Sequence, residues 1–412
     1  MTARSQAIDR YVLHPVWGTI ILALVLGAMF QAIFALAVHP QEWIRAGFAS
    51  LGHLVADVLP AGHLRSLLSG GILTGVGAVL MFLPQIVLLF LFLFAFEDSG
   101  YMPRIAVLTE KLLGRFGLSG CSVLPMLSSF ACAVPGMMAA RTISNKRDRM
   151  ITLLVAPLVP CSARLPVYSL LIAAFIPDRS VLGPVRLQGL VMLGLYIMGV
   201  VVALAVTAVL KKTVYKKLEA PACNISLPEY RLPSVRIVST GLFESARLFV
   251  RKAGTVILLF SIVIWFLSSF PRPPAGATGP SIAHSYAGMI GMALEPVIKP
   301  IGFNWQIGVA LIPSFASREI VVGALATVYS VETDSTAAID VLGRILSTNW
   351  SLATAMSLLV WYVLSCQCLS TIAVARRESG SWRLPALMIG YTTVLAYAAC
   401  FLTYNIVKAF TG

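Results

Sequence analysis

Residues 157–168 read Pro-Leu-Val-Pro-Cys-Ser-Ala-Arg-Leu-Pro-Val-Tyr and interrupt an apolar stretch that runs from Met150 to Ile176. A helix of this length can cross a bilayer, because about 30 Å of hydrocarbon needs roughly 20 residues. Each proline removes a backbone hydrogen-bond donor and frees a carbonyl one turn earlier. An arginine at membrane depth is costly and is usually functional or paired. The stretch therefore predicts a broken membrane segment that serves a function.

The composition of the whole chain agrees with a place in the bilayer. Of its 412 residues, 58% are hydrophobic and 12% are charged, and the mean hydropathy is +0.86. Such a composition does not suit a water-exposed surface of ordinary polarity. We expect an all-α polytopic membrane protein with about eight transmembrane helices. Their predicted positions are residues 17–38, 70–96, 150–176, 187–210, 252–270, 305–330, 350–374 and 384–408.

The net charge of +14 indicates a membrane topology and not a nucleic-acid partner. Lys and Arg lie mainly between the apolar runs, as the positive-inside rule describes. The basic segments 141–149 and 211–217 are therefore predicted to be cytoplasmic, with anionic lipid as their counter-charge. Simple alternation then places the basic loop 375–383 outside, and one re-entrant segment near 305–330 would remove this conflict.

Two segments of similar sequence predict a pair of re-entrant hairpins. Residues 119–140 contain two prolines and are followed directly by basic residues, so we expect a hairpin there. Within it, Ser129-Phe130-Ala131-Cys132 resembles Ser314-Phe315-Ala316-Ser317 of the second half. Irregular backbone at membrane depth persists only inside protein or beside a wet cavity, and two related halves around a midplane site recur in transporters. Coincidence is the alternative for a match of four residues.

Three residues of the broken segment are candidates for a transport path. Cys161, Arg164 and Tyr168 have the spacing of one helical face, where a thiolate and freed carbonyls could bind a cation. A kinked helix with a core cysteine is the alternative. Cys368, which forms the sequence Cys-Gln-Cys with Cys366, could likewise bind a soft metal or only pack.

Charged residues at the ends or in the middle of other apolar runs extend this set. Glu97 and Asp98 end one run, and Arg318 and Glu319 interrupt another. Such carboxylates either bind a cation or pair with an arginine, and both alternatives are open. We expect Arg164 to face Glu97, Asp98 or Glu319, because an unpaired buried charge is costly.

The sequence offers no sign of catalysis or of nucleotide binding. It contains no His-Glu-x-x-His pattern, which a zinc-dependent membrane enzyme would need. Residues 145–148, Asn-Lys-Arg-Asp, match a guanine-reading pattern, but the chain has no Gly-Lys dipeptide and hence no phosphate-binding loop. We therefore expect no enzyme activity, and GTP only through another domain or subunit.

Several stretches together resemble the membrane domain of ferrous iron transport protein B. They follow one another along nearly the whole chain: Glu97-Asp98-Ser99-Gly100-Tyr101-Met102, residues 114–118 and 132–142, Cys161-Ser162-Ala163-Arg164-Leu165-Pro166-Val167-Tyr168, Tyr230-Arg231-Leu232-Pro233, Ala253-Gly254-Thr255, Arg318-Glu319-Ile320-Val321-Val322-Gly323 and residues 368–382.

The resemblance implies uptake of Fe²⁺ across the bacterial inner membrane through two gate regions. Cys132, Cys161 and Cys368 would contact the metal, with Glu97, Asp98 and Glu319 as nearby carboxylates. It also implies a GTP-binding domain in cis or in trans and FeoA-like and FeoC-like small cytoplasmic partners, and it leaves homo-oligomerisation open. A carrier of nucleosides or other small solutes is the alternative function.

The predicted organisation has four parts. Residues 1–16 form an N-terminal cytoplasmic or interfacial segment, and residues 17–210 form the first membrane half with gate 1. Residues 211–251 form a cytoplasmic connector with an amphipathic helix, and residues 252–412 form the second membrane half with gate 2.

Overall fold

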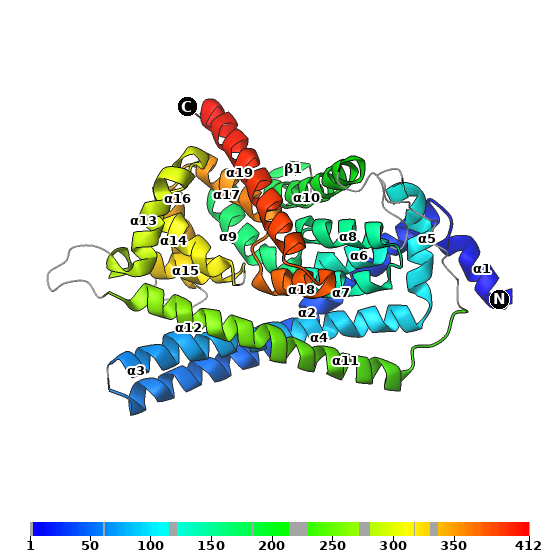
Figure 1. Cartoon of the computed structure of the whole chain (residues 1–412), viewed down its shortest axis with the longest axis horizontal. Coiled ribbons are helices and arrows are strands. Elements are labelled where there is room, and N and C mark those ends of the chain that lie inside the picture. Colours follow the sequence, from blue (N-terminus) through cyan, green and yellow to red (C-terminus); the bar gives the residue numbers. More distant parts are fainter. Residues whose placement is uncertain are drawn as a thin grey trace. The chain divides into compact units, whose positions relative to one another are not determined.

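The protein's structure is a computed structural model that describes residues 3–60, 62–114, 122–182, 185–213, 229–271, 281–316, 318–329 and 337–411 (Figure 1). Most of these residues are helical, which confirms the all-α class; the sheet that they contain is one small antiparallel hairpin. In chain order the elements are α1 (Ala3–Val12), α2 (Trp17–Val58), α3 (His63–Ser66), α4 (Thr74–Asp98), α5 (Tyr101–Gly114), α6 (Val123–Ala131), α7 (Ala133–Ala139), α8 (Lys146–Val155), α9 (Leu165–Phe175), β1 (Ser180–Leu182), β2 (Val185–Arg186), α10 (Leu187–Lys212), α11 (Val235–Phe249), α12 (Thr255–Ser269), α13 (Tyr286–Ile298), α14 (Trp305–Ser314), α15 (Ile320–Val328), α16 (Ala337–Asn349), α17 (Leu352–Leu364), α18 (Leu369–Ser379) and α19 (Arg383–Thr411).

Six helical segments of the described chain are long and apolar enough to cross a membrane. They are Trp17–Val58, His63–Asp98, Lys146–Phe175, Leu187–Lys212, Leu352–Ser379 and Arg383–Phe410. A multi-pass membrane protein is thus confirmed, with fewer long crossing helices than the predicted number of about eight.

Two predicted spans account for this difference. The segment 305–330 is broken between α14 and α15, whose 10 and 9 residues give about 15 Å each, half of a hydrocarbon core. The segment 252–270 belongs to one helical run that begins in α11, passes a π-helical turn at Val250–Gly254 and ends with α12. The apolar part of this run, Leu258–Ser269, is shorter than the six crossing segments.

Two of the six membrane-crossing segments, Lys146–Phe175 and Leu352–Ser379, are interrupted within their length, and these two are the most buried. In the apolar window of Lys146–Phe175 and of Leu352–Ser379, 72% of the residues are buried, against 12% to 27% in the other four segments. Interrupted backbone leaves N–H and C=O groups without helical partners, and lipid cannot satisfy them. The interruptions are therefore placed where protein surrounds them, while the unbroken helices have exposed apolar faces.

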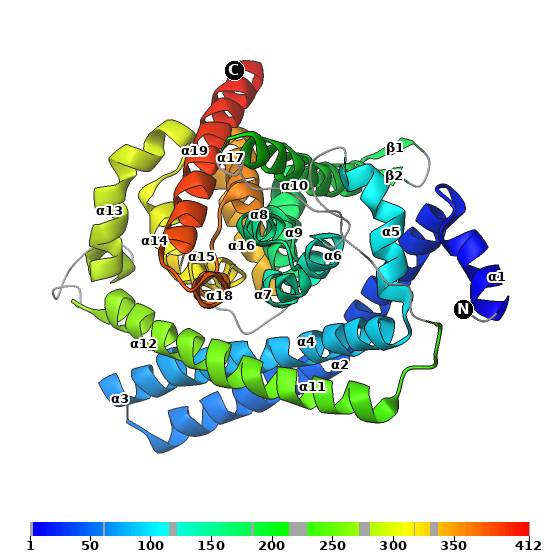
Figure 2. The ribbon, with the colours of Figure 1, turned by 45° about the vertical axis from the view of Figure 1, so that its right-hand side comes forward.

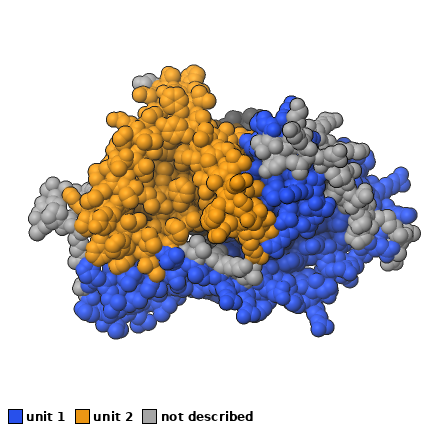
Figure 3. Space-filling model, in the orientation of Figure 1, with its two compact units in different colours: residues 1–156, 204–259 blue, residues 157–203, 260–412 orange. Residues whose placement is uncertain are grey.

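The chain forms two compact units (Figure 3). The first unit contains residues Met1–Ala156 and Leu204–Leu259, and the second contains Pro157–Ala203 and Phe260–Gly412. These units do not follow the predicted membrane halves 17–210 and 252–412. Residues 204–259 join the first unit because α11 packs on α4, and α9 joins the second unit because it packs on α16 and α17. The two halves concern membrane topology and stay a prediction.

In the first unit, three long helices lie side by side. Both α2 and α11 pack against α4 (Figures 1 and 2). Helix α2 has 42 residues, which at 1.5 Å per residue is about 63 Å, roughly twice the hydrocarbon thickness. The predicted span 17–38 is therefore only the first half of a helix that continues through Pro40 to Val58.

The first unit also contains the predicted hairpin, which turns at Cys132 between α6 and α7. A Cβ atom added at Gly136 would lie 2.0 Å from the Oγ of Ser129 and 2.6 Å from the carbonyl oxygen of Pro125. In one continuous helix, residues as far apart as 125 and 136 would be separated by about 16 Å. The chain therefore folds back on itself at Cys132; residues 119–121 of the predicted hairpin lie outside the described ranges.

The core of the second unit is built around α17. Nearly every residue of this helix is buried, and it packs against α19 and α9. A helix that is apolar on all sides needs partners on all sides, which explains its central place. The Oγ of Ser357 donates to the carbonyl oxygen of Ile301 at 2.7 Å, so even a polar residue of this helix is satisfied inside the core.

Candidate cation site at the helix interruptions

The three cysteines predicted to contact a metal all stand where a helix is interrupted. Cys132 immediately precedes α7, Cys368 precedes α18, and Cys161 precedes the 3₁₀ turn Ser162–Arg164 that leads into α9. Each has extended backbone, with φ and ψ of −155° and 134°, −162° and 107°, and −99° and 160°. At each point the helix stops and restarts, and carbonyl groups lose their helical donors.

The prediction that Cys161, Arg164 and Tyr168 share one helical face is wrong. The prolines end the preceding helix, Cys161 is extended, and α9 begins only at Leu165 with Pro166 in its first turn. The three side chains nevertheless remain neighbours, because the Arg164 guanidinium interacts electrostatically with both Cys161 and Tyr168. The Tyr168 ring is fully buried and lies edge-on to that of Tyr196, with 6.4 Å between the centroids.

Arg164 donates to backbone carbonyls of its own turn, while its Nε has no hydrogen-bond partner among the described residues. Its side chain is fully buried, and its Nη2 donates to the carbonyl oxygen of Pro157 at 2.8 Å and its Nη1 to that of Leu158 at 3.4 Å. Among the described residues of the second unit, no carboxylate lies within ion-pair distance of Arg164. Within the second unit, the proline-broken turn therefore supplies the acceptors of Arg164 in place of the Glu319 carboxylate, and a pairing with Glu97 or Asp98 of the first unit stays a prediction.

Arg318 makes the corresponding contacts at the second interruption. It is 4% exposed, and it donates through Nε to the carbonyl oxygen of Gln367 at 3.2 Å and through Nη2 to that of Ser365 at 3.3 Å. These carbonyls belong to the break between α17 and α18. Its Nη1 lies 3.9 Å from the Sγ of Cys161 and donates to it. One guanidinium thus joins the two interrupted spans.

Gln367 is a member of this cluster that the sequence reasoning did not single out. It lies between Cys366 and Cys368 and is fully buried. Neither its Oε1 nor its Nε2 has a hydrogen-bond partner among the described residues. A buried amide without partners is costly and uncommon in proteins. The signal in the sequence was a polar residue between two cysteines of an apolar stretch.

The other predicted metal residues are divided between the two units. Cys132 belongs to the first unit and packs against Met29, Ile33 and Leu89. Glu319 is half-buried at the start of α15 in the second unit. Glu97 is exposed at the end of α4. The second unit contains Glu319 and brings together Cys161, Cys368, Arg164, Arg318 and Tyr168.

Asp98 has a structural role at the end of α4. One of its carboxylate oxygens accepts from the Arg231 guanidinium, and the other accepts from the backbone N–H of Ser234 at 2.6 Å. The sequence left open whether this carboxylate binds a cation or pairs with an arginine, and in the structure it pairs with Arg231.

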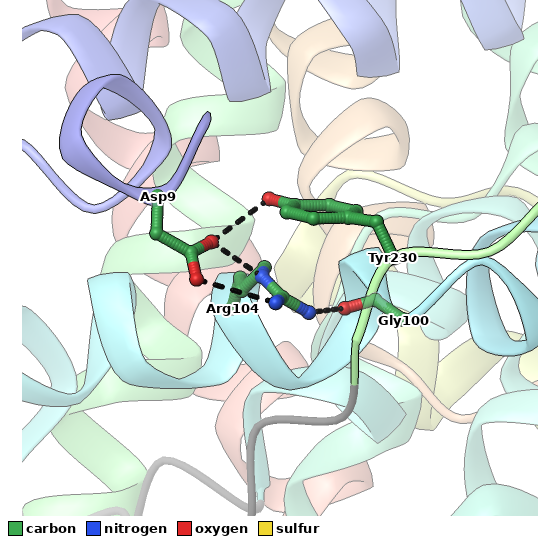
Figure 4. A network of polar contacts seen from close by, with 4 residues as sticks. All are labelled: Asp9, Gly100, Arg104 and Tyr230. Atoms are coloured by element: carbon green, nitrogen blue, oxygen red, sulfur yellow. Dashed lines mark hydrogen bonds and ion pairs between the residues drawn. The ribbon is translucent and has the colours of Figure 1, made fainter. Parts of the chain in front are cut away.

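A second polar network in the first unit was not predicted (Figure 4). The buried Arg104 donates through Nε and Nη2 to the carboxylate of Asp9 at 2.6 and 3.2 Å, and through Nη1 to the carbonyl oxygen of Gly100 at 2.5 Å. The Tyr230 hydroxyl donates to Asp9 at 3.1 Å, and its ring centroid lies 3.7 Å from the guanidinium carbon. Burial raises the pKa of Tyr230; the charge of Arg104 partly offsets this effect, and the hydrogen bond to Asp9 adds to it. The phenol therefore stays protonated and remains a donor.

The basic turn at 145–148 also has a structural role. The Asn145 side chain caps α8 by accepting from the backbone N–H of Arg147 at 2.9 Å. Arg147 and Asp148 are buried in the first turn of this helix. The resemblance to a guanine-reading pattern thus has a local explanation in helix capping.

The geometry of the second unit suits brief contact with a cation. Within the described residues, no three His, Cys, Asp or Glu side chains gather as a metal site would require. What lies together is one thiol, two backbone carbonyls and a buried amide, at Cys161, Ser365 and Gln367. Such a mixture of sulfur and oxygen suits a cation of borderline softness, and few ligands allow it to leave again.

Two family models match the chain. One, Gate, described as nucleoside recognition, matches residues 79–175 and 250–382, which include the interruptions at Cys132, Cys161 and Cys368. The other, described as ferrous iron transport protein B C terminus, matches residues 192–244.

Relatives of known name are similar over nearly the whole chain. A Fe(2+) transporter FeoB of Leptospira interrogans is 40% identical over 98% of this chain and 60% of its own length. One of Campylobacter jejuni is 34% identical over 98% of this chain and 65% of its own. A Fe(2+) transport protein A/Fe(2+) transporter FeoB fusion protein of Porphyromonas gingivalis is 37% identical over 98% of this chain and 51% of its own length. The chain thus spans about three fifths of the length of the first two. No solved structure matches.

Proposed function

The chain belongs to the Gate family, and from this premise we propose that it is the membrane part of a transporter that carries Fe²⁺ across the bacterial inner membrane. The names of its relatives and the match at residues 192–244 support this proposal. The chain itself would supply a path for the ion and perform no catalytic step.

One observation carries the proposal most directly. Cys161 and the carbonyls of residues 365 and 367 surround one buried positive charge, where two spans are interrupted. Thiol sulfur and carbonyl oxygen are ligands that Fe²⁺ accepts, and interrupted helices expose them at membrane depth. Cys368, Cys132 and the carboxylates of Glu97 and Glu319 are proposed as further contacts along the path.

A carrier of nucleosides is the second candidate, because the Gate model is described as nucleoside recognition. A nucleoside has no charge, and its recognition would use hydrogen bonds to its base and ribose. The thiols at positions 161, 366 and 368 would have no role in such recognition, which makes the iron path the better explanation of this cluster.

Uptake into liposomes separates the two functions. The purified chain, reconstituted without other proteins, is given radioactive Fe²⁺ under anaerobic reducing conditions or radioactive uridine, each down its own gradient. We expect uptake of iron above that of protein-free liposomes and no uptake of uridine. Uptake of uridine alone would reject the iron proposal in favour of the nucleoside carrier.

An FeoA-like partner is proposed from the name of one relative, and the GTP-binding domain and an FeoC-like partner are proposed from the resemblance of the sequence to ferrous iron transport protein B. The relatives are longer than this chain, and one of them is a fusion with Fe(2+) transport protein A. We expect a GTP-binding domain, in cis or in trans, to control the path, and FeoA-like and FeoC-like small proteins to bind the cytoplasmic side. Addition of these components to the liposomes should change the rate of iron uptake.

A further inference from the structure

The guanidinium of Arg318 is bound by the groups that a metal cation would use. It takes the Sγ of Cys161 and the carbonyl oxygens of Ser365 and Gln367 as acceptors. All three groups are present because the spans are interrupted: Cys161 and residues 365–368 have left the helical hydrogen-bond pattern. A charged side chain thus satisfies, from within the protein, the same acceptors that would hold a transported ion.

None of the three contacts of Arg318 is short. Hydrogen bonds between an ionised donor and an ionised acceptor are usually about 2.7–2.9 Å long. The contacts of Arg318 measure 3.2 and 3.3 Å to carbonyl oxygen and 3.9 Å to sulfur. Arg164 has one contact of 2.8 Å, to Pro157, and a second of 3.4 Å, to Leu158. Arg318 is thus held by neutral acceptors alone, with no short bond that fixes it in place.

Electrostatics prevents Arg318 and an ion from using the site together. The guanidinium groups of Arg164 and Arg318 repel each other, and no described carboxylate of the second unit lies within ion-pair distance of either. A divalent ion at Cys161 would add two more positive charges to a buried region, where repulsion is weakly screened. The ion can enter only if the charge of Arg318 leaves.

Gln367 is a second and independent sign of a ligand at this place. Its side-chain amide is fully buried, and neither polar atom has a partner among the described residues. Its own backbone carbonyl is one of the three acceptors of Arg318. An amide oxygen can be a ligand for a cation, so a bound ion is a partner that would satisfy it.

We propose that Arg318 is an internal competitor of the transported cation, whose guanidinium closes the path by occupying Cys161 Sγ and the carbonyls of residues 365 and 367. A soft or borderline divalent cation binds there only after it has displaced Arg318, and Gln367 then supplies its amide oxygen. This inference rests on the proposed function only for the identity of the ion.

The wild-type protein provides the first test. Cd²⁺, which is soft and inert to oxidation, is added to the purified chain, and phenylglyoxal then labels accessible arginines, which are mapped by mass spectrometry. We expect Cd²⁺ to raise the labelling of Arg318 at least five-fold and to leave Arg164 unlabelled. If Cd²⁺ protects Cys161 from N-ethylmaleimide while Arg318 stays unlabelled, ion and guanidinium bind together and the inference is overturned.

A pair of variants provides the second test. The Cd²⁺ concentration that protects half of Cys161 from N-ethylmaleimide should fall at least ten-fold in Arg318→Gln, because the competitor is gone. Arg376→Gln, which removes an exposed arginine of α18, should leave it unchanged. An unchanged or higher value in Arg318→Gln overturns the inference. If Arg318→Gln does not fold, the labelling of the wild type decides alone.

The two proposals can fail separately. If the wild type takes up no iron but Cd²⁺ still exposes Arg318 and protects Cys161, the inference stands and the iron function fails. If iron is taken up but Cd²⁺ leaves Arg318 unlabelled, the inference fails and the iron function stands.

Discussion

Replacement of Asp9 by Asn should destabilise the first unit far more than replacement of an exposed acid. The change leaves the charge of Arg104 fully buried without its carboxylate. Removal of one partner from a buried ion pair costs about 3–5 kcal/mol. We expect the lower end, about 3 kcal/mol, because Arg104 keeps the carbonyl of Gly100 and the ring of Tyr230, and an Asn oxygen can still accept one hydrogen bond.

A double-mutant cycle measures the pairwise part of this effect. Arg104→Met should also cost about 3 kcal/mol, because it leaves a buried carboxylate with only the Tyr230 hydroxyl. In the Asp9→Asn, Arg104→Met double variant neither charge remains, so the two losses should not add, and the coupling should be about 2–3 kcal/mol. Unfolding of the purified protein in mixed detergent and SDS micelles, followed by circular dichroism, gives the three free energies.

Asp178 and Arg186 form a matched control. Their ion pair is also short, at 2.7 Å, but the two side chains are 48% and 69% exposed. Asp178→Asn should therefore cost less than about 1 kcal/mol. The reasoning would be refuted if Asp9→Asn cost no more than Asp178→Asn, or if the effects at Asp9 and Arg104 were additive.

Three further results are expected. Gly136→Ala should lower the free energy of unfolding by about 1–3 kcal/mol, because its Cβ would meet the backbone of Pro125. Gly194→Ala, with open space around it, should stabilise the protein by about 0.5–1 kcal/mol in the same unfolding assay. Equal effects would contradict the close packing of α6 on α7. Asn145→Ala should lower stability by about 1 kcal/mol through loss of the α8 cap, and no change in unfolding would argue against the cap. The purified chain should show no saturable binding of a fluorescent guanine nucleotide, and micromolar binding that persists in Asn145→Ala would mean that a nucleotide site exists elsewhere.

The local features of the fold could be predicted from the sequence. Apolar runs of sufficient length predicted four of the unbroken membrane helices, and prolines predicted the interruption at Cys161. Two prolines and the basic residues after them likewise predicted a hairpin within residues 119–140, which the structure turns at Cys132. These signals lie within a few residues of the feature that they determine, which is why a single sequence reveals them.

Contacts between distant segments could not be predicted in the same way. Asp9 lies 95 residues from Arg104 and 221 residues from Tyr230, and no periodicity connects such positions. For Arg164, the sequence indicated a buried charge that needs a partner, but backbone carbonyls do not appear in a sequence as acceptors. The rule that buried charges pair pointed to a carboxylate, whereas the acceptors that the second unit supplies are the carbonyl oxygens of Pro157 and Leu158.

Iron uptake by a Cys161→Ser variant tests the proposed path most directly. Serine keeps most of the volume of the side chain and removes the soft ligand. Cys400→Ser is the control, because Cys400 is also buried in the second unit but its thiol donates to the carbonyl oxygen of Ser357. In liposomes with radioactive Fe²⁺, we expect Cys161→Ser to lose at least nine tenths of the uptake and Cys400→Ser to retain most of it. Full uptake by Cys161→Ser, with the variant folded, would contradict a path through this thiol.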